Sequence, residues 1–87
     1  MYDIFWSKPV SLEYPRKLAR LVEGPRAALE LLDNDWPARQ GRHYAAARDM
    51  CRAAIARLTS AEAAREIFIS AVIEAAVPIR QAARQSR

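Results

Sequence analysis

The stretch TSAEAAREIFISAVIEAAV, from Thr59 to Val77, decides the fold of this 87-residue chain. Its first four residues match the S/T-x-x-E capping box, in which a hydroxyl and a glutamate carboxylate accept hydrogen bonds from free backbone N–H groups at a helix start. Apolar residues then recur every three or four positions, which predicts a helix over residues 60–77. One apolar face of this helix comprises Ala64, Ile67, Phe68, Ala71 and Ala75.

The same stretch carries a second apolar row. Ile69, Ile73 and Val77 follow one another at four-residue spacing, and they lie roughly 140° to 220° around the helix from Ala64. A helix that is apolar on two sides is normally buried on two sides. Two interpretations stay open: the helix is the buried centre of the domain, between a hairpin and the other helices, or the row is an exposed stripe that pairs with a second copy.

The residues before this stretch predict two more helices. Residues 42–58 have a helical stripe, and residues 25–35, which precede them in the chain, have a shorter one. Pro25 suits the first helical position of this shorter helix. The shorter helix ends near Trp36, because a residue before proline is pushed out of the helical region. The longer stripe consists of Tyr44, Ala47, Cys51, Ala54, Ile55 and Leu58, and the shorter one of Ala28, Leu31 and Leu32.

The N-terminal part has a different period. From Pro9 to Tyr14 apolar and polar residues alternate, which is typical of a half-buried strand. Residues 18–23 carry a weaker version of the pattern, so we predict a β-hairpin over about 9–14 and 18–23. With the three helices, this predicts one small α+β domain over residues 1–79. Residues 80–87 have no core pattern and are expected to form a disordered basic tail.

The composition narrows the class of protein. No apolar run approaches the roughly 18 residues of a membrane span, and the N-terminus lacks the pattern of a signal peptide. We therefore expect a cytoplasmic protein without membrane contact, and the single cysteine, Cys51, fits a reducing compartment. The net charge is +4, but the tail contains three of the 14 basic residues, which leaves 11 basic against 10 acidic residues in the predicted domain. The domain itself is close to neutral.

Residues with catalytic or ligand chemistry are few. His43 and Cys51 lie eight residues apart on one predicted helix, roughly 12 Å along its axis, so they cannot form a nucleophile–base pair. They are too few for structural zinc, and the acidic cluster 33–35 lacks the glycine and glutamate of a calcium loop. Gly24 and Gly41 are too far apart for a phosphate loop, and the carboxylates are scattered over faces predicted to be exposed. We predict no catalytic residue, metal or cofactor, and no enzymatic activity. A third hypothesis, a small-molecule or catalytic site between the hairpin and the helix over 25–35, has only the aromatic residues Trp6 and Trp36 as support, and core packing explains them better.

Two kinds of interaction surface are candidates. A non-enzymatic protein-interaction or regulatory module would use the row Ile69, Ile73 and Val77, or an open strand edge of the hairpin, to bind a second copy or another protein. The alternative is a weak nucleic-acid-binding protein whose arginines contact phosphates. The first is favoured for two reasons. The helix over 60–77 would present isoleucines to base edges, which is the wrong chemistry for a major groove. The arginines of the helix over 42–58 spread around it, and those of the tail give only a non-specific contribution. The arginines of the alternative are Arg48, Arg52, Arg80, Arg84 and Arg87.

The order of the motifs resembles that of a known family, the domain-of-unknown-function family 982 of soil and plant-associated α-proteobacteria. The motifs are Trp6-x-x-Pro9-Val10-x-Leu12, Ala28-x-x-Leu31-Leu32, Trp36-Pro37, Tyr44-x-x-Ala47-x-x-x-Cys51, Ala64-Arg65-x-x-Phe68-Ile69-x-Ala71 and Glu74-Ala75. The resemblance covers nearly all of residues 6–79. It implies a short β-hairpin with helices and no established activity, cofactor or catalytic residue. The chain departs from the family pattern at Leu58 and Ala76, where relatives commonly carry glycine.

Overall fold

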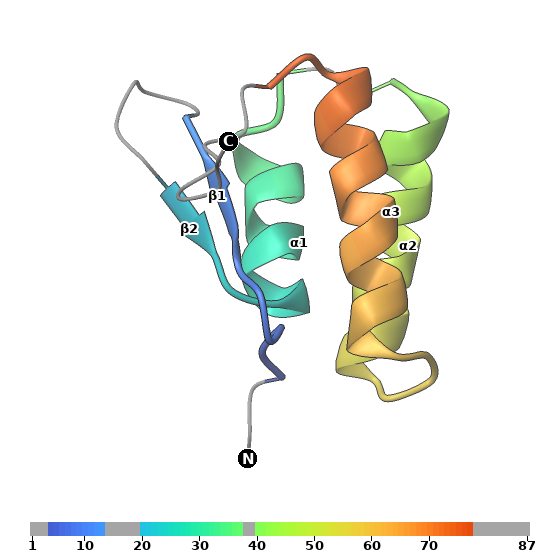
Figure 1. Cartoon of the computed structure of the whole chain (residues 1–87). Coiled ribbons are helices and arrows are strands. Elements are labelled where there is room, and N and C mark those ends of the chain that lie inside the picture. The colour runs from blue at the N-terminus through green and yellow to red at the C-terminus, as the bar shows by residue number, and fades with distance from the viewer. Residues whose placement is uncertain (1–3, 14–19, 38–39, 78–87) are drawn as a thin grey trace.

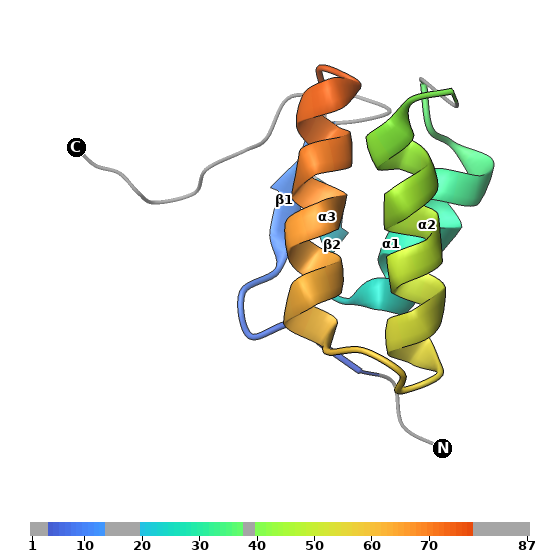
Figure 2. The ribbon, with the colours of Figure 1, turned by 90° about the vertical axis from the view of Figure 1, so that its right-hand side faces the viewer.

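The computed structural model describes residues 4–13, 20–37 and 40–77. An antiparallel hairpin precedes three helices, which confirms the predicted α+β architecture (Figure 1). The helices α2 and α3 run antiparallel side by side, while β1 lies behind α3 and α1 behind α2 (Figure 2). No helix in the described part of the chain is long and apolar enough to cross a membrane. The elements are β1 (Val10–Leu12), β2 (Arg20–Val22), α1 (Pro25–Asn34), α2 (Arg42–Ile55) and α3 (Ala61–Glu74).

One continuous core joins the hairpin to the helices. Phe68 of α3 lies at its centre, with its ring centroid 5.8 Å from that of Trp6 and 5.7 Å from that of Trp36. Tilted aromatic pairs at such distances stabilise beyond the burial of their surface. In the hairpin, Val10 pairs with Val22, and both side chains are buried. Trp6 and Trp36 therefore bring the N-terminal segment and the end of α1 onto α3.

The start of α3 differs from the predicted capping box by one residue. The N-cap is Ser60, whose hydroxyl accepts a hydrogen bond from the Ala63 N–H at 3.0 Å. The prediction that Thr59 fills this position is wrong. Glu62 then lies in the first turn, where the helix dipole favours a negative charge. The motif favours Thr59, because Glu62 lies three residues after it, but the adjacent hydroxyl of Ser60 is the one that caps the helix.

The helix α2 ends at Ile55, three residues before the predicted end. Arg57 has a left-handed backbone, with φ 63°. The Leu58 N–H donates to the Ala53 carbonyl at 2.8 Å, and the Arg57 N–H donates to the Ala54 carbonyl at 3.0 Å. These two bonds form a Schellman motif, which terminates a helix. Leu58 consequently leaves the buried stripe in which it was predicted and is 80% exposed.

The helix α3 ends at Glu74 in the same way, so the predicted end at residue 77 is also wrong. Ala76 has φ 58°. The Val77 N–H donates to the Val72 carbonyl at 3.1 Å, and the Ala76 N–H donates to the Ile73 carbonyl at 3.0 Å. Here the turn directs the side chain after it onto the core. Val77 is only 7% exposed.

Candidate functional site

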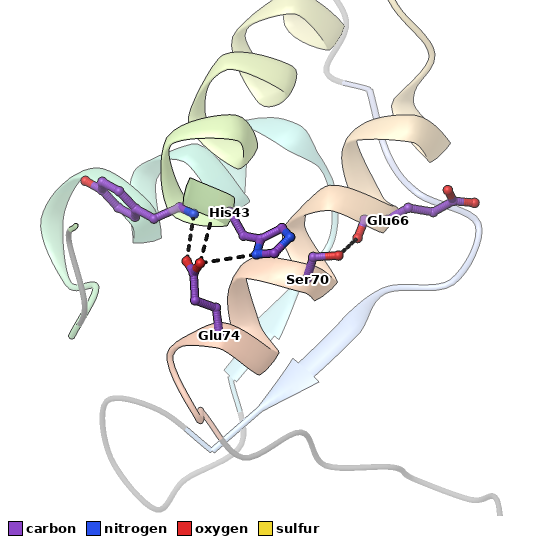
Figure 3. A network of polar contacts seen from close by, with 5 residues as sticks. His43, Glu66, Ser70 and Glu74 are labelled. Carbon is purple, nitrogen blue, oxygen red and sulfur yellow. Dashed lines mark hydrogen bonds and ion pairs between the residues drawn. The ribbon is translucent and has the colours of Figure 1, made fainter. Parts of the chain in front are cut away.

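A carboxylate from α3 closes the N-terminal end of α2. Glu74 accepts hydrogen bonds from the backbone N–H groups of His43, at 3.1 Å, and Tyr44, at 3.0 Å (Figure 3). The first N–H groups of a helix have no acceptor within the helix. The N-cap residue of α2 is Gly41, which has no side chain to supply one. A residue from another helix thus fills the role that a local Ser, Thr or Asp usually has.

Gly41 makes this approach possible. A Cβ atom at this position would overlap the carboxylate of Glu74. The φ of Gly41 is −77°, which any residue adopts, so space rather than backbone conformation requires the glycine. The sequence placed Gly41 in a loop before a helix. The structure shows that this loop end is half of a contact between α2 and α3.

His43 makes a second contact with the same carboxylate. Its Nδ1 lies 3.2 Å from Glu74 Oε2. The hydrogen bond from the His43 N–H is the main reason that the pKa of Glu74 is lowered. Desolvation acts in the opposite direction, and the Tyr44 N–H and the His43 ring lower the pKa further. Glu74 lies at an exposed position, as predicted for the carboxylates, but its carboxylate is held by the start of α2.

A histidine held by a carboxylate also occurs in hydrolytic triads, which in addition need a nucleophile beside the histidine. Ser70 lies one turn before Glu74 on α3 (Figure 3). Its hydroxyl donates to the Glu66 carbonyl at 3.2 Å, a bond within its own helix. The Cys51 thiol is buried in the core, as its stripe position predicts, and burial raises its pKa to about 12. A thiol of this kind is inert. The contacts of Glu74 with His43 and Tyr44 close the start of α2.

The described residues offer no group of three His, Cys, Asp or Glu side chains that could hold a metal ion. Among the arginines of the nucleic-acid hypothesis, Arg48 is joined to α1. Its Nε donates to Asp33 Oδ1 at 2.7 Å, and its guanidinium lies 5.7 Å from the Tyr44 ring centroid. Arg52 lies 3.9 Å from Asp49, and both side chains face solvent. The other three lie outside the described residues: Arg80, Arg84 and Arg87.

The structure separates the second apolar row of α3 into three environments. Ile69 is half-buried and packs against the core. Ile73 is 68% exposed. Val77 belongs to the core itself, because α3 has ended before it. The exposed part of the row is therefore centred on Ile73, with Ile69 one turn away.

A second exposed apolar surface lies where β2 leads into α1. Phe5 is 63% and Leu21 is 54% exposed, and both line a groove of about 310 Å³. Between the hairpin and this helix the sequence drew attention to Trp6 and Trp36, which are both buried, and not to Phe5 or Leu21. One signal for this surface was nevertheless available. Leu21 and Val22 are adjacent apolar residues in a strand, so they point to opposite faces, and only one can enter the core. The other lining residues are Ile4, Glu23, Gly24, Arg26, Ala27 and Glu30.

Comparison with known proteins adds the family. The model of the family described as protein of unknown function (DUF982) matches residues 8–79. The chain belongs to the DUF982 family. The DUF982 fold is also similar to the NMR structure of the Agrobacterium tumefaciens protein Atu1219, with 28% sequence identity and a TM-score of 0.78 over 97% of this chain and 84% of that chain. No curated protein matches the sequence. The DUF982 family carries no established activity.

Proposed function

We propose that this protein is a non-enzymatic interaction module that forms a homodimer through the outer face of α3, the surface formed by Ile69 and Ile73. The exposure of Ile73 carries the proposal. This branched side chain stands in water on the helix that supplies the centre of the core, and Ile69 extends the apolar surface by one turn. A two-fold dimer uses the same patch on both copies, so the row formed by Ile73 and Ile69 would pack against its own copy.

Several contacts support the non-enzymatic part of the proposal. The groups with catalytic chemistry have structural partners: Glu74 and His43 close the start of α2, and Cys51 is buried. The ion pair of Arg48 with Asp33 favours protein interaction over phosphate binding, because it holds the guanidinium against α1. We place the module in the cytoplasm, where a lone thiol such as Cys51 stays reduced.

Sedimentation velocity over a range of protein concentrations tests the homodimer. The wild-type mass should rise with concentration, and Ile73→Glu should give a monomer with an unchanged circular dichroism spectrum. Leu58→Glu is the matched control, since Leu58 is also an exposed aliphatic residue but lies in the connection between α2 and α3. It should dimerise like the wild type. A wild-type monomer at every concentration, or an equal loss in both variants, would refute the proposal.

A further inference from the structure

We infer that the groove between residues 4–5, β2 and α1 binds a segment of a protein partner in which a bulky apolar side chain is flanked by lysine or arginine. This surface is separate from the outer face of α3. Its centre is formed by Phe5 and Leu21, both more than half exposed. Scattered single apolar side chains are ordinary on a surface, whereas neighbouring ones that share a concave surface form a candidate interaction site.

The groove is preformed, because the wall that residues 4–5 form is fixed to the rest of the fold through Trp6. The Trp6 backbone N–H donates to the Glu23 carbonyl at 2.7 Å, and the Trp6 indole N–H donates to the Ala61 carbonyl at the start of α3 at 2.7 Å. The indole is buried. Phe5 is thus held at the groove by its neighbour. A surface that needs no ordering on binding loses less entropy when a partner docks.

Gly24 lets residues 4–5 pass close to the connection between β2 and α1. A Cβ atom there would overlap the carbonyl oxygen of Ile4 and would lie 3.2 Å from the Cα of Phe5. The φ of Gly24 is −177°, which is extended backbone open to any residue. Glycine is therefore needed for the close passage of the N-terminal segment. This passage shapes a groove whose volume, about 310 Å³, is at the lower end for ligand sites, roughly 300 Å³. It suits one or two anchoring side chains.

The charges around the groove define the partner. Its lining contains two carboxylates, Glu23 and Glu30, and one guanidinium, Arg26. The lining thus has a formal charge of −1, opposite in sign to the net charge of +4 of the chain. Complementary charge steers association and excludes wrong partners. An apolar anchor flanked by positive charges matches this lining, whereas an acidic segment meets two like charges.

Three nine-residue synthetic peptides test the inference. Each has a central Leu-Phe pair, and they differ only in their flanks, which are lysine, serine or glutamate. Each peptide is titrated into the full-length, ¹⁵N-labelled protein, and amide shifts are followed by NMR. The lysine peptide should bind most tightly and the glutamate peptide least, with shifts concentrated at residues 4–6, 21–27 and 30. Equal binding of the three peptides, or shifts centred elsewhere, would overturn the inference.

Single substitutions in the groove measure how much each lining residue contributes to peptide binding. Leu21→Ser should weaken the lysine peptide roughly tenfold through lost apolar contact, and Glu30→Lys roughly two- to fivefold or more. Arg26→Glu should strengthen it. Asp49→Lys is the control, because it makes the same reversal at an exposed position of α2, and it should leave binding unchanged. An equal loss in this control, or unchanged binding by Leu21→Ser and Glu30→Lys, would contradict the assignment.

Two further measurements separate this site from other outcomes. Ile73→Glu should retain full peptide binding, so the groove can succeed or fail independently of the homodimer proposed above. If the groove amides instead shift with protein concentration in the absence of peptide, a second copy of the chain occupies the groove. That result would overturn the assignment to a basic partner.

Discussion

The ends of α2 and α3 share one backbone motif and differ in the fate of the residue that follows it. Each helix ends in a Schellman turn with a left-handed residue that is not glycine, Arg57 or Ala76. After the first turn, Leu58 faces solvent; after the second, Val77 enters the core. The same local geometry therefore makes a surface connection at one end of the helix pair and a tertiary contact at the other.

The end of α3 and the turn after it make two tertiary contacts that have no counterpart after α2 in the described part of the chain. Glu74 closes the start of α2, and Val77 packs into the core three residues later. At the end of α2, Leu58 stays outside the core cluster. A helix end is thus defined by backbone hydrogen bonds, while its importance for stability depends on what its side chains reach. Substitutions at the two ends should separate these contributions.

The largest difference is expected between the two residues after the turns. Val77→Ala should lower the free energy of unfolding by about 2 kcal/mol, because it removes buried apolar surface and leaves a cavity. Leu58→Ala removes a side chain that is already in water and should change it by less than about 0.5 kcal/mol. Urea denaturation of both variants measures the difference. Equal losses would show that the turn itself, rather than burial, sets the stability of these ends.

The contact of Glu74 with the start of α2 should make a smaller, pH-dependent contribution to stability. Glu74→Gln should lower stability at neutral pH, because an ionised acceptor makes stronger hydrogen bonds than an amide. The pKa of Glu74 is lowered from its ordinary value of 4.5. Its contribution is therefore complete above this value and is lost as the pH falls through the lower pKa of the folded state. The urea midpoints of wild type and variant should thus differ at neutral pH and converge in acid.

Two other variants test whether the carboxylate acts at the start of α2. Gly41→Ala should reproduce the loss at neutral pH, because its methyl group displaces Glu74. Glu66→Gln, at an exposed position of the same helix, should leave the midpoint unchanged. A gap between wild type and Glu74→Gln that persists unchanged in strong acid would show that the loss does not come from the charged cap.

Local patterns explain why the order of elements was predictable and the helix ends were not. Alternation in β1 and the helical stripes act over a few residues, so the sequence displays them directly. A Schellman turn usually announces itself by glycine. Here Arg57 and Ala76 occupy the left-handed positions, and the apolar Leu58 and Val77 continue the stripes beyond the true ends. The patterns therefore predicted helices about three residues too long.

The surfaces were less predictable because they depend on pairing between distant segments. Glu74 reaches α2 only after α2 and α3 pack antiparallel, and the contact joins residues 31 positions apart. The sequence offered one weak sign, a glycine rather than a hydroxyl residue at position 41. The groove similarly requires residues 4–5 to cross Gly24. By contrast, the burial of Cys51 follows from one helical stripe and was predicted.

The smallest effects are expected from the left-handed residues themselves. A side chain in this conformation costs roughly 1 to 2 kcal/mol, and glycine removes most of that cost while gaining entropy in the unfolded chain. Arg57→Gly and Ala76→Gly should therefore each raise stability, by about 0.5 to 1 kcal/mol, as measured by thermal unfolding. Ala75→Gly is the control, since Ala75 has φ −84° and gains nothing from glycine; it should destabilise. The two turns share one geometry, whereas Leu58 and Val77 differ in burial. Equal gains in stability at both sites would therefore show that the strain resides in the backbone. Unequal gains would show that the packing of Val77 already compensates for the strain.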